Sequence, residues 1–187
     1  MSWNSTKGIK GFHYTCGFCG TYVGPSIGYI HDEPNKRIRI CPKCDNPTFF
    51  RGDKQTPAPL LGNKVTNVPA EIATLYNEAR ACTGVNSFTA TVLACRKLLM
   101  HIAVDKGADE GKHFIEYVEY LSDAGYVPPD GKEWVNHIRN KGNEANHEIV
   151  IMSESDALDL ITFIEMLLKF IYEFPSRIPQ KTSDPPS

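Results

Sequence analysis

Two Cys-x-x-Cys pairs lie in the first quarter of the chain and offer four thiols to one metal ion. The pairs are Cys16–Cys19 and Cys41–Cys44, and 21 residues separate them. A tetrahedral zinc ion takes four thiolates at about 2.3 Å, and each pair can supply two of them from one tight turn. The pattern predicts a zinc ribbon with one structural Zn²⁺ ion per chain, whose ligands are Cys16, Cys19, Cys41 and Cys44.

Two other uses of these cysteines stay open, namely disulfides and free thiols. Residues 1–15 carry Lys7 and Lys10 and no continuous apolar stretch, so they lack the pattern of a secretory signal. A reducing, cytoplasmic location is therefore expected, and disulfides are rare there. His13 and His31 could each replace a thiolate, but four suitably spaced cysteines complete the ligand set, so neither histidine is expected to bind the metal.

A second group of chemically active side chains lies in residues 134–147. Arg139, Asn143 and His147 could converge on a phosphate, because Arg is a bidentate donor, Asn can fix an oxygen, and His exchanges protons near neutral pH. In the alternative, Asn143 caps the segment after Gly142, while Arg139 and His147 satisfy polar groups inside a helical bundle. Both interpretations stay open.

The same segment resembles the domain of unknown function 4145 family. The matching residues are Arg139, Gly142, Asn143, Ala145 and His147, with Arg96–Leu99 upstream and Tyr172–Pro175 downstream. The resemblance covers about residues 70–178 and implies an all-helical domain of bacteria and phages, often fused to restriction or other defence components. That family is in turn distantly similar to the HEPN superfamily, whose active members are metal-independent ribonucleases that use an Arg and a His from paired subunits.

The N-terminal segment is mildly basic and rich in aromatic residues, which suits a partner surface. Residues 1–54 hold eight basic and four acidic side chains, although the whole chain has a net charge of −2. Aromatic rings can stack on unpaired bases while cations follow phosphates, but a module of this size also needs rings for its own core. Nucleic acid and protein are both kept as partners. The candidate contact residues are Lys36, Arg37, Arg39, Lys43 and Arg51.

Periodicity and turn residues predict the elements that position these groups. In a zinc ribbon spanning 1–54, short strands are expected at 12–15, 21–30, 37–40 and 47–51. Residues 55–69 contain three prolines and no amphipathic period, and predict a linker. Helices are expected at 70–81, 86–106, 112–124, 132–141 and 153–174. Residues 179–187 predict a disordered tail.

These elements predict a mainly α fold, with a five-helix bundle over 70–178 and a small N-terminal β zinc ribbon. The family resemblance makes the expected bundle HEPN-like. The last helix begins after Ser153 as its cap and carries an apolar arc too wide for a simple surface helix, so it is expected to be central or to form a homodimer interface. Asp159, Glu165 and Lys169 interrupt its middle and exclude a membrane span.

The sequence therefore favours a non-enzymatic, zinc-binding adaptor or regulatory module that recognises nucleic acid or a partner protein. The family resemblance implies a prokaryotic or phage defence setting for it. The alternative is a metal-independent HEPN-like ribonuclease that uses Arg139 and His147, with Asn143 beside them. Glycine-rich phosphate loops, His-Glu-x-x-His helices and paired-carboxylate nuclease patterns are absent from the sequence.

Overall fold

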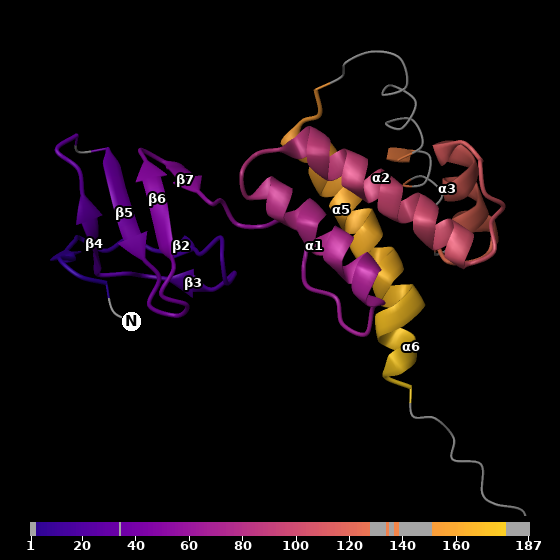
Figure 1. Ribbon diagram of the computed structural model, residues 1–187, viewed down its shortest axis with the longest axis horizontal. Helices are drawn as coiled ribbons and strands as arrows, with labels where there is room; N and C mark the ends of the chain where they lie inside the picture. Colours follow the sequence, from indigo (N-terminus) through magenta and orange to yellow (C-terminus); the bar gives the residue numbers. More distant parts are fainter. Residues whose placement is uncertain (1–2, 34, 128–133, 135–136, 139–150, 179–187) are drawn as a thin grey trace, which may run out of the picture. The chain divides into compact units, whose positions relative to one another are not determined.

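The chain folds as two compact units (Figure 1). The computed structural model describes residues 3–33, 35–127, 134, 137–138 and 151–178. Unit 1 consists of Met1–Leu61 and Arg80–Ser87, and unit 2 consists of Gly62–Ala79 and Phe88–Ser187. Each unit has buried residues of its own and is stabilised by its own core.

Unit 1 is built on two antiparallel sheets. The larger sheet has five strands in the order β1-β4-β5-β6-β7, and the smaller sheet pairs β2 with β3. From β4 to β7 each strand pairs with the next one along the chain, so this part of the sheet is a series of hairpins. The strands are β1 (Lys7–Gly8), β2 (Tyr14–Thr15), β3 (Tyr22–Val23), β4 (Ile27–Ile30), β5 (Lys36–Ile40), β6 (Pro47–Arg51) and β7 (Lys54–Thr56).

The strand expected over residues 21–30 is divided in the structure. β3 ends at Val23 and β4 begins at Ile27, with Pro25 between them. Proline has no N–H to donate to a ladder, so the chain leaves one sheet here and enters the other. Strands β1 and β7 lie outside the predicted strands, because strands of two and three residues are too short to show an alternating pattern.

The central strands β5 and β6 pair residue for residue. Ile38 lies opposite Phe49, and Arg37 lies opposite Phe50. Since side chains alternate along a strand, Phe50 and Phe49 lie on opposite faces of the sheet. Phe50 is buried, and the ring of Tyr14 packs edge-on against it with 4.9 Å between the centroids. The core of unit 1 therefore lies on the Phe50 face.

Helices make up most of unit 2. They are α1 (Ala70–Thr83), which runs on into the part of the chain assigned to unit 1, α2 (Phe88–Asp105), α3 (Phe114–Asp123), α5 (Glu154–Leu168), the π-helical turn η2 (Lys169–Glu173) and α6 (Phe174–Ser176). At the start of α5, the Ser153 side chain accepts the Asp156 N–H, and the Asp156 carboxylate accepts the Ser153 N–H. This reciprocal capping confirms the predicted cap and satisfies donors that a helix start leaves open.

The centre of unit 2 is the packing of α2 against α5, with α3 packed on α2 (Figure 1). The side chains at this centre are fully buried, among them Leu99, Ile102, Ile161 and Ile164. Burying one such side chain contributes roughly 1.5–3 kcal/mol, so this helix pair supplies a large part of the stability of unit 2. Within the described residues, the helices lack the combination of length and apolar character that crossing a membrane requires.

The expectation of a mainly α protein with a five-helix bundle is wrong. The described residues contain four helices of ten or more residues, together with a five-stranded and a two-stranded sheet. Two edge strands without an apolar pattern enlarge the sheet beyond a small ribbon. The helix expected over 132–141 lies largely outside the described residues. Of its positions the structure describes Trp134, His137 and Ile138, and these three are helical.

A buried carboxylate fixes part of the segment that the sequence analysis took as a linker. Glu165 on α5 accepts hydrogen bonds from the backbone N–H of Asn63 at 2.7 Å and from the Asn63 side-chain amide at 3.0 Å, and it forms an ion pair with Lys169. Gly62 has φ of 67°, and a Cβ there would lie 2.5 Å from the Ile161 side chain. The chain therefore enters unit 2 through a close contact with α5.

We expect the stability of unit 2 to fall in acid partly through Glu165. Burial alone raises the pKa of Glu165, but hydrogen bonds from Lys169 and Asn63 outweigh it and hold this pKa below the ordinary 4.5. A carboxyl group whose pKa is lower in the folded than in the unfolded state stabilises the fold at pH values above its unfolded-state pKa. This contribution is lost as the pH falls through the folded-state pKa. Urea unfolding at pH 7 and at pH 3 should therefore show a smaller difference for Glu165→Gln than for the wild type.

The control for this comparison is Glu110→Gln, because Glu110 is an exposed turn residue. This variant should keep the wild-type pH dependence. At pH 7, the free energy of unfolding of Glu165→Gln should be about 1–3 kcal/mol lower than that of the wild type, since the charged acceptor of three part-buried hydrogen bonds has been replaced. An identical pH dependence in all three proteins would contradict the role given to Glu165.

Candidate metal centre

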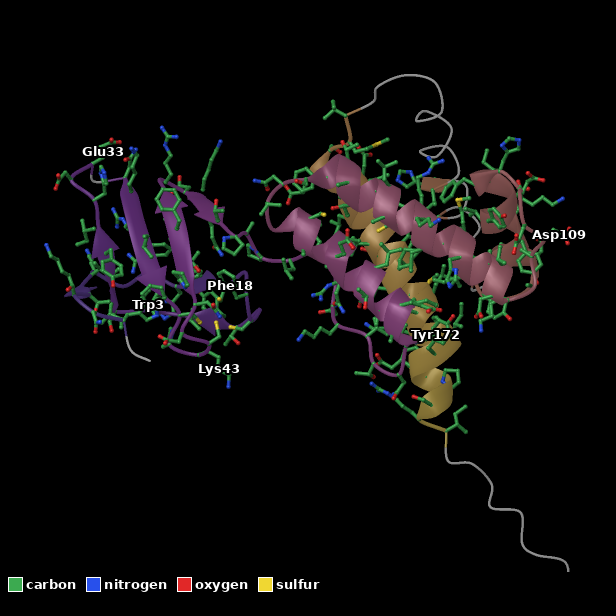
Figure 2. All side chains as sticks on the ribbon, in the orientation of Figure 1. Trp3, Phe18, Glu33, Lys43, Asp109 and Tyr172 are labelled. Atoms are coloured by element: carbon green, nitrogen blue, oxygen red, sulfur yellow. The ribbon has the colours of Figure 1, made fainter. Side chains whose placement is uncertain are left out.

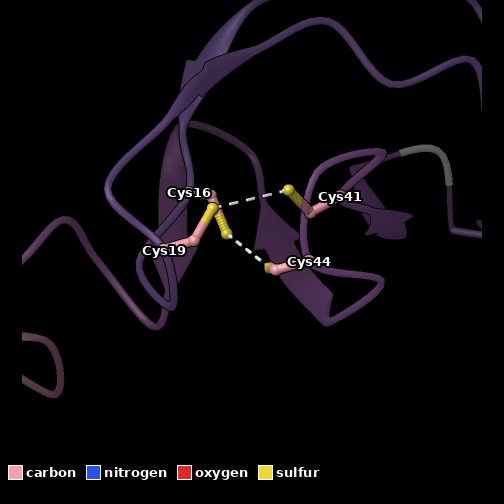
Figure 3. Close-up of side chains that lie close together, drawn as sticks. All are labelled: Cys16, Cys19, Cys41 and Cys44. Carbon is pink, nitrogen blue, oxygen red and sulfur yellow. Dashed lines mark hydrogen bonds between the residues drawn. The ribbon is translucent and has the colours of Figure 1, made fainter.

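The four cysteines predicted to bind zinc come together in unit 1. Their sulfur atoms all lie within 4.8 Å of one another, and the Cys16–Cys44 and Cys19–Cys41 Sγ pairs are each 3.8 Å apart (Figure 3). A disulfide has its sulfurs about 2.05 Å apart, so these are free thiols. A tetrahedron with Zn–S bonds of about 2.3 Å has edges of about 3.8 Å, so the cluster fits a metal ion of this size.

The first pair of cysteines sits on a tight loop after β2. The Cys16 N–H donates to the carbonyl of Thr21 at 3.0 Å, and the Gly20 N–H donates to the carbonyl of Cys16 at 2.8 Å. Gly20 has φ of 68°, in the left-handed region that glycine adopts without strain. These bonds turn both thiols of the loop toward the same point (Figure 3).

The second pair sits on a loop of the same design after β5. The Cys41 N–H donates to the carbonyl of Asn46 at 3.0 Å, and the Asp45 N–H donates to the carbonyl of Cys41 at 2.9 Å. Asp45, at the position equivalent to Gly20, has φ of 57°, a conformation that Asp tolerates better than most residues. Two loops with one hydrogen-bond pattern therefore present two thiols each.

Gly17 meets a different structural requirement from Gly20, whose φ lies in the left-handed region. A Cβ on Gly17 would instead lie 2.4 Å from the carbonyl oxygen of Pro57 and 2.6 Å from that of Ala58. Gly17 is therefore needed because another part of unit 1 passes directly over the loop.

The four thiols sit in unequal environments. Cys16 and Cys41 are buried, Cys44 is half-buried and Cys19 is exposed. Burial raises the pKa of the Cys16 thiol to about 12 against the opposing N–H groups of Cys19 and Phe18. Burial also acts to raise the pKa of Cys19, but hydrogen bonds from Thr21 outweigh it and lower that pKa to about 6. The Cys16 thiol therefore keeps its proton at neutral pH in the absence of a metal ion, and a bound cation must displace it.

Beyond the thiols, the cluster has no fifth candidate ligand in the described residues. No other group of three or more His, Cys, Asp or Glu side chains there could hold a metal ion. The ring of His13 stacks on Tyr22 with 5.4 Å between centroids, and Nδ1 of His31 accepts the Glu33 N–H. Four thiolates would fill a tetrahedral shell, which leaves no position for a reacting water.

Arg39, predicted as a contact residue, is not on the surface of unit 1. Its side chain is fully buried, and its guanidinium donates to the carbonyls of Lys10 at 2.7 Å and Pro25 at 3.3 Å. It also lies over the ring of Phe12, 4.1 Å from the centroid. Arg39 is a structural residue that holds the loops of unit 1 against the Phe50 face of the sheet.

The other predicted contact residues are distributed over unit 1. Lys36 and Arg51 lie opposite each other on β5 and β6, and Lys36 forms an ion pair with Glu33 at 2.7 Å. Arg37, one residue further along β5, lies on the other face of the sheet. Lys43 is exposed in the second cysteine loop, at the opposite end of unit 1 from Glu33 (Figure 2). Of this set, Lys36 and Arg51 therefore lie side by side on one face of the sheet.

The residues of the ribonuclease alternative, Arg139, Asn143 and His147, lie outside the described residues. The structure shows a different contact in this region, which the sequence analysis missed. Nε2 of His137 lies 2.8 Å from Oδ2 of Asp159 on α5. The two residues are 22 positions apart, so no local motif could have paired them.

The fold and the cluster define a two-unit protein with a four-cysteine candidate metal centre in its β unit and a second, helical unit. Comparison with known families assigns a family to the helical part of the chain. The sequence model described as "Domain of unknown function (DUF4145)" matches residues 77–184, more than half of the chain. The chain belongs to this family, which confirms that part of the predicted resemblance. No curated protein and no solved structure matches it.

Proposed function

We propose that this chain is a zinc-binding adaptor, in which one structural Zn²⁺ ion holds unit 1 in shape for recognition of a partner. The observation that supports zinc is the cluster itself, with two sulfur pairs at 3.8 Å on two loops of equal design. A closed shell of four thiolates suits a structural metal rather than a catalytic one. Elemental analysis of the purified chain should find one zinc ion per chain, and replacing Cys44 by Ser should abolish it.

The main chemical competitor of zinc at four thiolates is iron. Zinc is colourless, whereas thiolate-bound iron absorbs visible light, so elemental analysis and a visible spectrum distinguish the two. A chain that carries iron, or no metal at all, would contradict the proposal. The defence setting and the ribonuclease that uses Arg139 and His147 stay predictions from the family resemblance.

We also propose that the adaptor forms a homodimer through the last helices. Leu158, Phe170 and Phe174 are exposed by 44%, 49% and 42%, and Phe170 and Phe174, which are four residues apart, form a short apolar stripe on one side of η2 and α6. The rings of Phe170 and Phe174 pack edge-to-face with 5.4 Å between their centroids. These side chains are uncharged, so two copies of the stripe can meet without repulsion between like charges.

Replacing Phe170 by Lys should weaken this dimer about tenfold or more, because burial of one aromatic ring is lost from each side. Light scattering across a dilution series measures the change in the dissociation constant. The matched control is Leu93→Lys, since Leu93 is 58% exposed on α2 and does not belong to the stripe. A wild-type chain that is monomeric at all concentrations would contradict the dimer and leave the zinc site unaffected.

A further inference from the structure

The face of the larger sheet opposite Phe50 carries two parallel rows of side chains. One row crosses β4, β5 and β6 as Tyr29, Ile38 and Phe49, which lie opposite one another in the register. We call this the apolar row. The next row along the strands crosses β5, β6 and β7 as Lys36, Arg51 and Lys54. We call it the basic row. Pleating places both rows on the same face, since their members are two residues apart.

The apolar row leaves aromatic surface open to solvent. Phe49 is 40% exposed although it lies in the middle of the sheet. Across the row, the ring of Tyr29 is held by a hydrogen bond from its hydroxyl to the carbonyl of Asn4 and by edge-on contact with Trp3, itself 38% exposed. A shallow cavity of about 170 Å³ over Ile38 lies between Tyr29 and Phe49. It is smaller than the roughly 300–1,000 Å³ of a drug-sized ligand site, and suits one flat ring.

The basic row is unfavourable for the sheet on its own. Like charges directly opposite on neighbouring strands repel, and here three cations follow one another at a strand spacing of about 4.8 Å. Glu33 pairs with Lys36. In the part of the chain that the structure describes, no carboxylate forms an ion pair with Arg51 or Lys54. An anion that spans this row would relieve the repulsion, and the successive phosphates of a nucleic-acid strand supply negative charge at regular intervals.

We propose that this face of unit 1 binds single-stranded nucleic acid, with phosphates along the basic row and a base stacked on Phe49 between the two rings of the apolar row. The inference rests on the proposed function, because the zinc-held unit forms the face. Unpaired bases are required, since an exposed ring cannot reach the flat side of a base inside a duplex. A protein partner is disfavoured by the two lysines, because lysine is depleted at the centres of protein interfaces.

The test measures binding of the zinc-loaded, full-length chain to fluorescein-labelled oligonucleotides of mixed sequence and about 20 residues, by fluorescence anisotropy. Three probes are compared: single-stranded DNA, single-stranded RNA and the DNA duplex. Phe49→Leu keeps an apolar side chain but removes the ring, and should weaken binding of single strands roughly 5- to 100-fold. The double variant Arg51→Gln, Lys54→Gln should reduce the slope of log affinity against log salt by about 1.4.

Matched controls are available on the same unit. Tyr22→Leu removes a ring that is 70% exposed on the smaller sheet. Lys7→Gln removes an exposed cation on β1, opposite Gly28 and therefore on the other face of the larger sheet. Both controls should bind as the wild type does. Preference for DNA or for RNA among the single-stranded probes identifies the natural class, and the inference holds for either.

Two outcomes overturn the inference. One is a zinc-loaded wild type that binds none of the single strands, even if it binds a protein partner. The other is binding that Phe49→Leu and the double variant leave unchanged while all proteins unfold at the same urea midpoint. Both leave the proposed function in place if the same sample contains one zinc ion per chain. A sample without zinc fails the proposed function instead, and the two failures are therefore distinguishable.

Discussion

Removal of the metal is expected to unfold unit 1 while unit 2 stays folded. The core cluster of unit 1 consists of Tyr14, Val23, Phe50 and two of the cysteines, Cys16 and Cys41. A core of this size supplies little stability by itself, whereas zinc binding contributes about 10–16 kcal/mol in zinc-finger peptides. Loss of the ion therefore exceeds what the remaining contacts can offset.

The chain offers a separate fluorescent reporter for each unit. Its two tryptophans are Trp3 and Trp134. The indole N–H of Trp3 donates to the carbonyl of Asp45, directly after the last predicted ligand, at 2.8 Å. Trp134 packs edge-on against Phe163 of unit 2 with 5.4 Å between centroids. In a Trp134→Phe variant, chelation should shift the emission of Trp3 to the red, and restoring zinc should reverse the shift.

Cys16→Ser should reproduce the effect of chelation, since it removes one buried ligand. The matched control is Cys82→Ser, because Cys82 is a half-buried thiol outside the cluster. The control should bind one zinc ion and keep the wild-type emission. Acid should act in the same direction as chelation, because protons compete with the metal for the thiolates. If strong chelators left the emission spectrum of Trp3 unchanged, a structural role for the metal would be refuted.

The second large effect is expected at Arg39, where truncation to Ala should destabilise zinc-loaded unit 1 by about 2–5 kcal/mol. The variant leaves two carbonyls without their donors, the buried one of Pro25 and the part-buried one of Lys10, at up to roughly 1–3 kcal/mol each. It also removes the contact with the ring of Phe12. Burial, with the charge of Arg37 adding to it, lowers the pKa of Arg39, but a guanidinium stays protonated.

Urea unfolding followed by Trp3 emission measures this loss. Arg39→Lys should recover little of it, since one ammonium cannot replace the planar fork that reaches both carbonyls. Arg51→Gln is the control, because Arg51 is an exposed cation on the neighbouring strand. Its free energy of unfolding should match that of the wild type within about 0.5 kcal/mol. If Arg39→Ala were as stable as this control, the structural role of Arg39 would be wrong.

The three arginines of β5 and β6 differ in a way that no local sequence pattern indicates. Arg37, Arg39 and Arg51 look alike in sequence, and alternation along a strand separates only odd from even positions of β5. Which face is buried depends on the loop around Phe12, which folds over Arg39 from far earlier in the chain. The pairing of Arg51 with Lys36 on the open face depends on the β5–β6 register. Neither contact is local, so neither leaves a local pattern.

The amino-acid sequence by itself determined the four cysteines, the capping of the last helix by Ser153, and the membership of the helical part in its family. These features depend on groups a few residues apart, or on motifs in a fixed order, and short-range geometry is enough to read them. Tertiary structure alone decided the mixed α and β fold, the burial of Arg39, the His137–Asp159 pair and the two rows on the sheet. Each of these requires segments distant in sequence to pack together, and that packing is chosen by the free energy of the whole unit.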